Sequence, residues 1–146
     1  MSILDIKFTK DDDGVHDFNI AEEGDFELDT TIENPLNASL LTNARADVSE
    51  VPIAKDRGGW WGNELYEVIG HQFGSKLHLL KQRRFNEETK NIVTDYILKS
   101  LQWLIDDGIV QDINVSASLV YGDANIIEAV ITLINDEKTE VLTFTF

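Results

Sequence analysis

Residues 87–107 read EETKNIVTDYILKSLQWLIDD and carry the clearest helical pattern in the chain. Its apolar residues recur at spacings of three and four, which places them on one face of an α-helix; they are Ile92, Val93, Tyr96, Ile97, Leu101, Leu104 and Ile105. Asn86 is a good N-cap, and acidic residues follow it in the first turn. Gly108 is a natural C′ stop. We therefore expect a helix that buries one face.

The residues after Gly108 alternate between apolar and polar and predict three strands. The first has Ile113, Val115, Ala117, Leu119 and Tyr121 on one face, the second Ile127, Ala129, Ile131 and Leu133, and the third Leu142, Phe144 and Phe146. Short turns between them indicate an antiparallel sheet. Val130 and Ile134 make the second strand apolar on its other face as well, which suggests a central strand covered on both sides. We expect an α+β fold in which the helix covers one face of this sheet.

The first half of the chain predicts smaller elements. Alternating apolar residues between positions 4 and 28 indicate short strands in a small meander, separated by the turns at 11–14 and 23–25. Asn34 before Pro35 would cap a helix running to about Arg45. A long central loop follows over 46–75, and a short helix is expected over 75–84. With 146 residues and a hydrophobic fraction of 42%, we expect one compact domain over 1–146.

Charge narrows the classes of partner. The net charge is −15, and residues 1–33 carry eleven acidic residues against two lysines. Residues 45–90 hold eight basic and seven acidic residues, a net +1. Nucleic acid and anionic membranes bind surfaces that carry clustered, unbalanced Lys and Arg. Because acidic residues nearly balance the basic ones even over 45–90, we expect neither as a partner. The N-terminus lacks the basic and apolar regions of a signal peptide, which predicts a cytoplasmic protein unless it leaves inside a larger particle.

Chemical motifs are sparse, and we expect no catalytic, cofactor-binding or metal-ligating residues. The chain has no cysteine and only three histidines. Glu64, Glu67 and His71 would share a helical face as a carboxylate–imidazole set, but solvated polar residues explain them better. Residues 11–22 resemble a calcium loop, although Val15 and His16 stand where a ligand and a glycine are needed. No spacing encodes the paired carboxylates of a glycosidase.

Residues 56–63 read DRGGWWGN, an unusual composition because two adjacent tryptophans lie among three glycines. In an extended loop Trp60 and Trp61 would point in opposite directions, one into the core and one toward a partner. The alternative places both rings in the core of the domain, where they would hold a long loop. The residues by themselves leave both interpretations open.

These residues belong to a longer set that resembles the small baseplate wedge protein of Mu-like phages and prophages, which is related to the small wedge subunit of other contractile tails. The matching elements are Gly24-Asp25 with Leu28, residues 39–46 (SLLTNARA), Arg57, Gly59-Trp60-Trp61-Gly62, Gly74-Ser75-Lys76-Leu77, Leu79-Leu80, Trp103-Leu104 and Asp107-Gly108. Three positions depart from the family pattern. Asn63 replaces an acid, His78 replaces an aromatic residue, and Ala44-Arg45 replaces a pair of arginines.

The resemblance implies a structural subunit without cofactors that joins other wedge and hub proteins, is present in six-fold copies, and helps to seat the tail sheath. It implies a location in the virion tail baseplate, after assembly in the host cytoplasm. Candidate interface or loop-fixing residues are Arg45, Arg57, Trp60, Trp61, Phe144 and Phe146, the last two on a final strand that could pair with a neighbour's strand.

Three alternatives to this interpretation remain at the level of sequence. The first is a tail-associated, lysozyme-like cell-wall hydrolase, which would need a pair of catalytic carboxylates. The second is an adaptor in a tailocin or another contractile system, which would have the same physical properties. The third is a domain unrelated to tails.

Overall fold

The computed structural model describes residues 5–10, 16–18, 20–22, 24–29, 31–51, 56–65, 72–121, 126–135 and 139–145. The chain divides into two compact units, 1–38 and 39–146, which are described separately below. The expectation of a single domain over 1–146 stays a prediction. Among the described residues, no helix is long and apolar enough to cross a bilayer.

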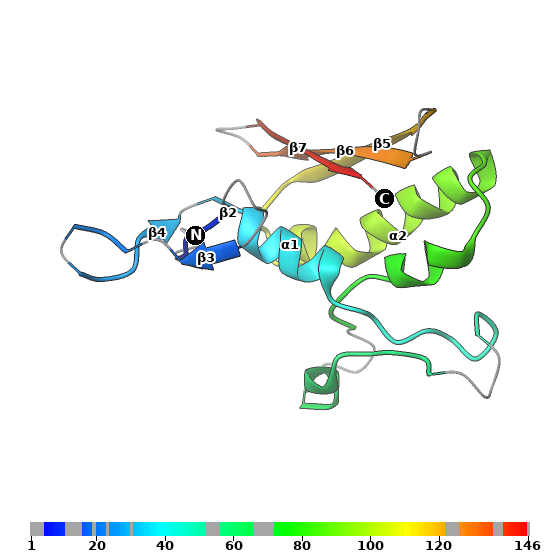
Figure 1. Ribbon diagram of the computed structural model, residues 1–146, viewed down its shortest axis with the longest axis horizontal. Coiled ribbons are helices and arrows are strands. Elements are labelled where there is room, and N and C mark those ends of the chain that lie inside the picture. The colour runs from blue at the N-terminus through cyan, green and yellow to red at the C-terminus, as the bar shows by residue number, and fades with distance from the viewer. Residues whose placement is uncertain are drawn as a thin grey trace. The chain divides into compact units, whose positions relative to one another are not determined.

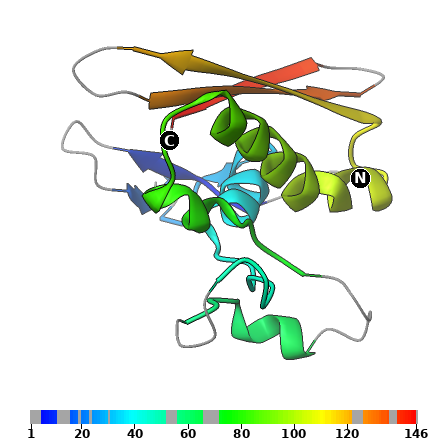
Figure 2. The same ribbon diagram turned by 90° about the vertical axis from the view of Figure 1, so that its right-hand side faces the viewer.

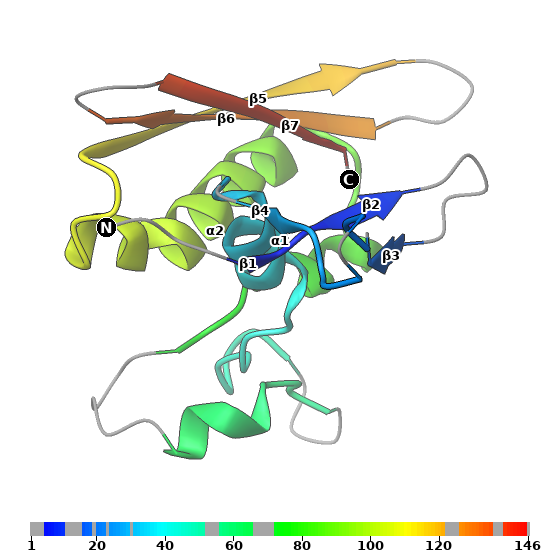
Figure 3. The same ribbon diagram turned by 90° about the vertical axis from the view of Figure 1, so that its left-hand side faces the viewer.

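The second unit is built on one long helix and one sheet. Helix α2 spans Glu87–Asp106. Strands β5 (Asp112–Val120), β6 (Ile126–Ile134) and β7 (Thr139–Thr145) form an antiparallel sheet in the order β5-β6-β7. α2 lies along one face of this sheet (Figure 1), and the two turned views agree (Figures 2 and 3). The predicted α+β arrangement is confirmed.

α2 begins and ends where local chemistry predicts. The Asn86 side chain accepts a hydrogen bond from the Thr89 N–H at 2.9 Å, so it satisfies a donor left free in the first turn. Gly108 has a φ of +68°, the left-handed conformation that ends many helices. Four apolar side chains are completely buried along one face; they are Val93, Ile97, Leu101 and Leu104.

The sheet turns its apolar residues toward that helix. In β6 the alternate residues Ile127, Ala129, Ile131 and Leu133 are each at most 5% exposed. The central position predicted for this strand is confirmed by its pairing on both sides. The other face of β6, with Val130 and Ile134, is only half-buried. The expected second cover is therefore incomplete over the described residues.

The short helices differ from their predictions. α1 spans Glu33–Leu41, so Asn34 lies within it and is not its cap; instead the Glu33 N–H contacts Thr31 Oγ1 at 3.4 Å. α1 stops four residues before Arg45 because the residues after Leu41 hydrogen-bond to distant segments. The predicted helix at 75–84 is a 3₁₀ helix, η2 (Leu77–Gln82), and a second one, η1, spans Trp61–Leu65.

The first unit contains two small sheets where one meander was expected. β1 (Asp5–Ile6) pairs with β4 (Leu28–Asp29), and β2 (Phe8–Lys10) pairs with β3 (His16–Phe18), all antiparallel. An ion pair between Lys7 and Glu27, 2.8 Å, joins the residue between β1 and β2 to the residue before β4. The turn expected at 11–14 and half of the calcium-like loop lie outside the described residues.

Candidate interaction site: an aromatic segment held by a short anchor

Hydrogen bonds from a third segment hold two segments of the second unit together. We call residues 56–65 the aromatic segment and residues 74–77, the Gly-Ser-Lys-Leu motif, the anchor. Residues 42–50 lie between them and bond to both. In all three ribbon views residues 45–51 and 56–65 lie away from α2, on the side opposite to the sheet (Figures 1–3).

The anchor begins with a glycine for a steric reason. Gly74 has a φ of +106°, and a Cβ at this position would lie 2.7 Å from the Thr42 carbonyl oxygen. This close approach lets Ser75 N–H donate to Thr42 O and lets Ala44 N–H donate to Ser75 O, both at 2.8 Å. The buried Ser75 hydroxyl donates to Leu40 O at 2.5 Å. The first two residues of the motif therefore join the anchor to the end of α1.

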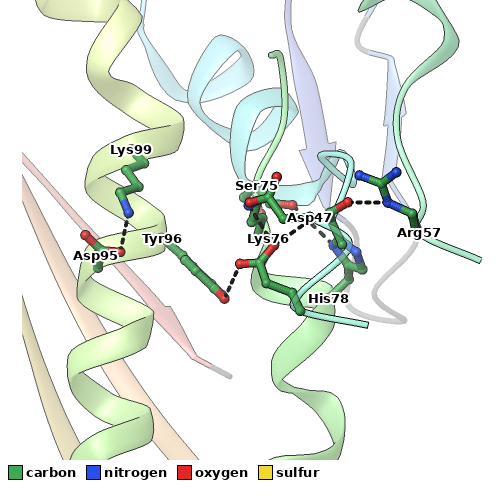
Figure 4. A network of polar contacts seen from close by, with 10 residues as sticks. Asp47, Arg57, Ser75, Lys76, His78, Asp95, Tyr96 and Lys99 are labelled. Atoms are coloured by element: carbon green, nitrogen blue, oxygen red, sulfur yellow. Dashed lines mark hydrogen bonds and ion pairs between the residues drawn. The ribbon is translucent and has the colours of Figure 1, made fainter. Parts of the chain in front are cut away.

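Lys76 extends the anchor into an ionic network. Its Nζ donates to Asp47 Oδ2 and to Glu50 Oε2, both at 2.7 Å. Tyr96 OH on α2 donates to Glu50 Oε1 at 3.3 Å. Figure 4 shows Tyr96 extending from α2 toward this network. The Lys76 and Glu50 side chains are 22% and 23% exposed, whereas Asp47 is 67% exposed. The network thus ties the 47–50 turn to the long helix.

The network shifts the pKa of each of its members. Partial burial alone would lower the pKa of Lys76, but its hydrogen bonds to the two carboxylates outweigh burial and raise the pKa above 10.5. For Glu50, burial acts to raise the pKa, but the hydrogen bonds from Lys76 and from the Asp47 N–H, together with the charge of Lys76, outweigh it, so the pKa falls below 4.5. The hydrogen bond from Lys76 also lowers the pKa of Asp47. Burial and the adjacent Glu50 charge raise the pKa of Tyr96.

The two arginines of the predicted site are placed differently. Arg57 Nε donates to Ala46 O at 2.6 Å, and Ala46 N–H donates to Arg57 O at 2.8 Å. Arg57 therefore holds the start of the aromatic segment against Ala46. Arg45 is exposed, and a Cβ added to Gly59 would lie 3.1 Å from its Cβ.

The two tryptophans lie side by side rather than on opposite faces. Their ring centroids are 5.8 Å apart, and Trp60 also contacts Phe73 at 5.3 Å. Trp60 folds over Gly62, where a Cβ would lie 2.3 Å from the indole, so the glycine makes room for the ring. Trp60 is 37% exposed and Trp61 is 73% exposed. Neither side chain is buried in the main core, and Trp61 offers most of its surface to solvent.

An asparagine closes the aromatic segment. Asn63 Oδ1 accepts from the Phe73 N–H at 2.9 Å, and Asn63 Nδ2 donates to Phe73 O at 3.4 Å. An amide makes both bonds because it carries an acceptor and a donor, whereas an ionised acid at this position would only accept. Sequence reasoning noted Asn63 as a departure from the family pattern but did not find its partner. The ionic role of Asp47, Glu50 and Tyr96 was not predicted either: the two acidic residues had no signal but their charge, and Tyr96 was expected only on the apolar face of its helix.

The remaining predicted residues lie on or beyond the last strand. Phe144 is half-buried in β7 opposite Ala129 of β6, whereas Phe146 lies outside the described residues. β7 pairs with β6, and among the described residues no strand pairs with its other edge. This edge presents backbone groups that another strand could bond.

Metal and catalytic chemistry find little support in the described part of the chain. No group of three or more His, Asp or Glu residues there is placed to hold a metal ion. The Glu67 and His71 of the carboxylate–imidazole prediction lie outside it, as does the side chain of Glu64. What the site offers is an exposed aromatic surface on a backbone held at several points, which suits binding by contact.

Comparison with known proteins places the chain in a family. Residues 32–140 match the family model described as phage protein GP46. The chain is 32% identical over 117 residues to the Mu-like prophage FluMu protein gp46 of Haemophilus influenzae, covering 80% of this chain and 78% of that protein. It is also 32% identical over 106 residues to the baseplate protein gp46 of Escherichia phage Mu, covering 70% of this chain and 71% of that protein.

Proposed function

The chain belongs to the phage protein GP46 family, and on that basis we propose that it is a structural subunit of a contractile-tail baseplate, in a phage, prophage or tailocin. The observation that carries the proposal is the similarity to a phage Mu protein named as a baseplate protein, over 70% of this chain. In this role the protein acts through contacts with other wedge and hub proteins and performs no catalysis. Its place is the virion baseplate, reached after assembly in the host cytoplasm.

The aromatic segment is the proposed contact with a neighbouring wedge or hub protein. Large aromatic side chains contribute most to interface energy when a partner removes them from water. Trp61 exposes 73% of its surface. Its ring packs against Trp60, which in turn contacts Phe73 and lies over Gly62. Because the anchor and Arg57 hold the backbone on which these rings stand, little conformational entropy is lost when a partner binds. Arg45, exposed beside Gly59, would pair with a carboxylate at the rim.

The free edge of β7 is the proposed contact with the sheath. A partner strand added there would extend the three-stranded sheet through backbone hydrogen bonds. Val141 is 61% exposed on this strand, and Phe144 is half-buried. Six such subunits would present six equivalent edges around the hub. Val141→Lys, which adds a charge of the kind that blocks strand addition at edges, should leave the subunit folded and weaken attachment of the sheath.

An affinity pull-down from cells that produce the tail tests the proposed function. Tagged protein should recover other baseplate and sheath proteins, identified by mass spectrometry, and should itself be present in purified particles. A well-folded protein that recovers none of them and is absent from particles would contradict the structural role. In that case a zymogram on cell-wall substrate becomes the next measurement.

Trp61→Ala tests the aromatic contact within the same experiment. The variant should keep its stability, because the side chain is mostly solvated, and should recover at least one baseplate protein less efficiently than wild type. Ile20→Ala is the matched control, since Ile20 is 71% exposed and lies outside the aromatic segment. Equal recovery by both variants would rule out Trp61 as a contact residue.

A further inference from the structure

A second surface of the 39–146 unit has properties of a binding groove. It lies between the end of α1, η2, the start of α2 and β6, and encloses about 460 Å³. Cavities of this size accommodate several side chains. Most of its lining is apolar and includes Leu40, Leu41, Leu77, Leu80, Phe85 and, from β6, Ile127. Leu41 is 72% exposed, so part of this apolar lining faces solvent directly.

The rim of the groove carries concentrated positive charge in an acidic protein. Lys81, Arg83 and Arg84 all line it, and all three are exposed. No ion pair links any of them to a carboxylate among the described residues, and no described acidic residue lines the groove. Elsewhere, by contrast, four lysines form ion pairs; they are Lys7, Lys76, Lys90 and Lys99.

Apolar lining and unpaired basic rim together define the chemistry of an occupant. A carboxylate near Arg83 or Arg84 would form charge-assisted, bidentate hydrogen bonds, which are stronger than bonds between neutral groups. A large apolar side chain would displace water from the lining around Leu41. Nucleic acid fits this surface less well, because the protein as a whole, at a net charge of −15, would repel its phosphates.

We propose that this groove binds an acidic, apolar segment of another baseplate protein, with apolar side chains in the groove and carboxylates on Arg83 and Arg84. The proposal rests on the proposed function, since it takes the occupant from the same assembly. It adds a contact at η2, which directly follows Lys76 of the ionic network.

Site-specific photo-crosslinking in assembled tails tests the proposal. Leu41→p-benzoylphenylalanine places the probe in the groove, and the same probe at Val48, 59% exposed and outside the groove, is the control. We expect the Leu41 probe to join one segment of another tail protein, and sequencing of the linked peptide should show carboxylates beside large apolar residues. A link to a second copy of this chain, to a segment without acids, or to nothing would overturn the proposal.

Charge reversal then separates the groove from the overall role. Arg83→Glu with Arg84→Glu should lower the crosslink yield by about tenfold, the loss expected when a charge-assisted hydrogen bond is removed. Lys99→Glu, which reverses a 72% exposed lysine elsewhere on the unit, should leave the yield unchanged. Acid-to-lysine changes in the identified peptide should restore the yield against the reversed groove. An unchanged yield in the reversed variant, in particles that still contain the protein, would refute the groove while leaving the baseplate role intact.

Should the double reversal lower the amount of folded protein, Arg83→Gln with Arg84→Gln provides the second measurement. It removes the charges without adding new ones, and circular dichroism shows whether the variant is folded. The crosslink yield should again fall, by less than in the reversed protein. A folded glutamine variant with full yield would count against the proposal.

Discussion

The layer of α2 and the sheet differs in kind from the region formed by the aromatic segment and the anchor. In the first, apolar side chains such as Leu101 and Ile131 are completely buried, so burial of surface holds the layers together. In the second, a positive-φ glycine, backbone hydrogen bonds and a lysine with two carboxylates hold the chain. A layer held by burial tolerates many substitutions at its exposed positions. A region held by a few specific hydrogen bonds and ion pairs is sensitive to single substitutions of the residues that make them.

Because burial holds the layer of α2 and the sheet, we expect the largest loss of stability from substitutions of its buried side chains. Leu101→Ala removes a fully buried side chain from α2 and should lower the free energy of unfolding by about 3 kcal/mol. Urea denaturation followed by circular dichroism measures it. Leu98→Ala on the same helix, where the side chain is 38% exposed, should cost about 1 kcal/mol or less. Equal losses in the two variants would mean that burial does not hold this layer.

The next largest effect is expected where the anchor approaches α1. Gly74→Ala would place a Cβ 2.7 Å from Thr42 O at a φ of +106°, and should cost about 2 kcal/mol through backbone strain and weakened hydrogen bonds. Gly108→Ala is the control, because its φ is also positive but nothing lies within 4 Å of the added Cβ. If the two variants lose the same free energy of unfolding, the close approach contributes nothing beyond the φ angle.

A smaller effect is expected at the closure of the aromatic segment. Asn63→Ala leaves the N–H and carbonyl of Phe73 without their side-chain partner, at a cost of about 1 kcal/mol. Amide hydrogen exchange of Phe73 should become faster in the variant. Asn91→Ala, an exposed position on α2, should change neither quantity appreciably. Unchanged protection of the Phe73 amide would show that the asparagine does not hold the segment closed.

The smallest effect, and the one most sensitive to conditions, is expected at the ionic network. Lys76→Met should cost about 1 kcal/mol or less at neutral pH, and added salt should reduce the difference from wild type. Salt titrations of the unfolding midpoint measure this difference. A difference that persists in high salt would indicate that packing of the lysine stem matters more than its charge.

The pH dependence of that difference follows from the directions of the pKa shifts. The pKa values of Asp47 and Glu50 are lowered on folding, so their contribution is present above their ordinary values of 3.8 and 4.5 and is lost as the pH falls through the folded values. The pKa of Lys76 is raised, so its contribution is present below 10.5 and is lost as the pH rises through the folded value. Wild type and Lys76→Met should therefore converge in stability at both extremes. A constant difference across the pH range would contradict the network.

The same contrast explains what could be predicted from the sequence. α2 was predicted to within one residue at its C-terminus, together with its cap and its buried face, because helix periodicity and caps are local features. The order of the three strands followed from short turns and alternation. The end of α1 was misplaced because Thr42 and Ala44 bond to Ser75, far along the chain, and no local pattern marks such a pairing.

Residue types at short spacings were enough to predict the α+β layer and to give the resemblance to the family. The positions of the aromatic residues, by contrast, depend on the packing of the whole unit. This packing placed Trp60 over Gly62 and beside Phe73, left Trp61 exposed, and brought Lys76 between residues 47 and 50. Trp103 illustrates the reason, because its indole N–H donates to the buried Ser39 hydroxyl at 3.0 Å across a separation of 64 residues. Contacts of this range depend on how the whole chain packs, and no short stretch of sequence specifies them.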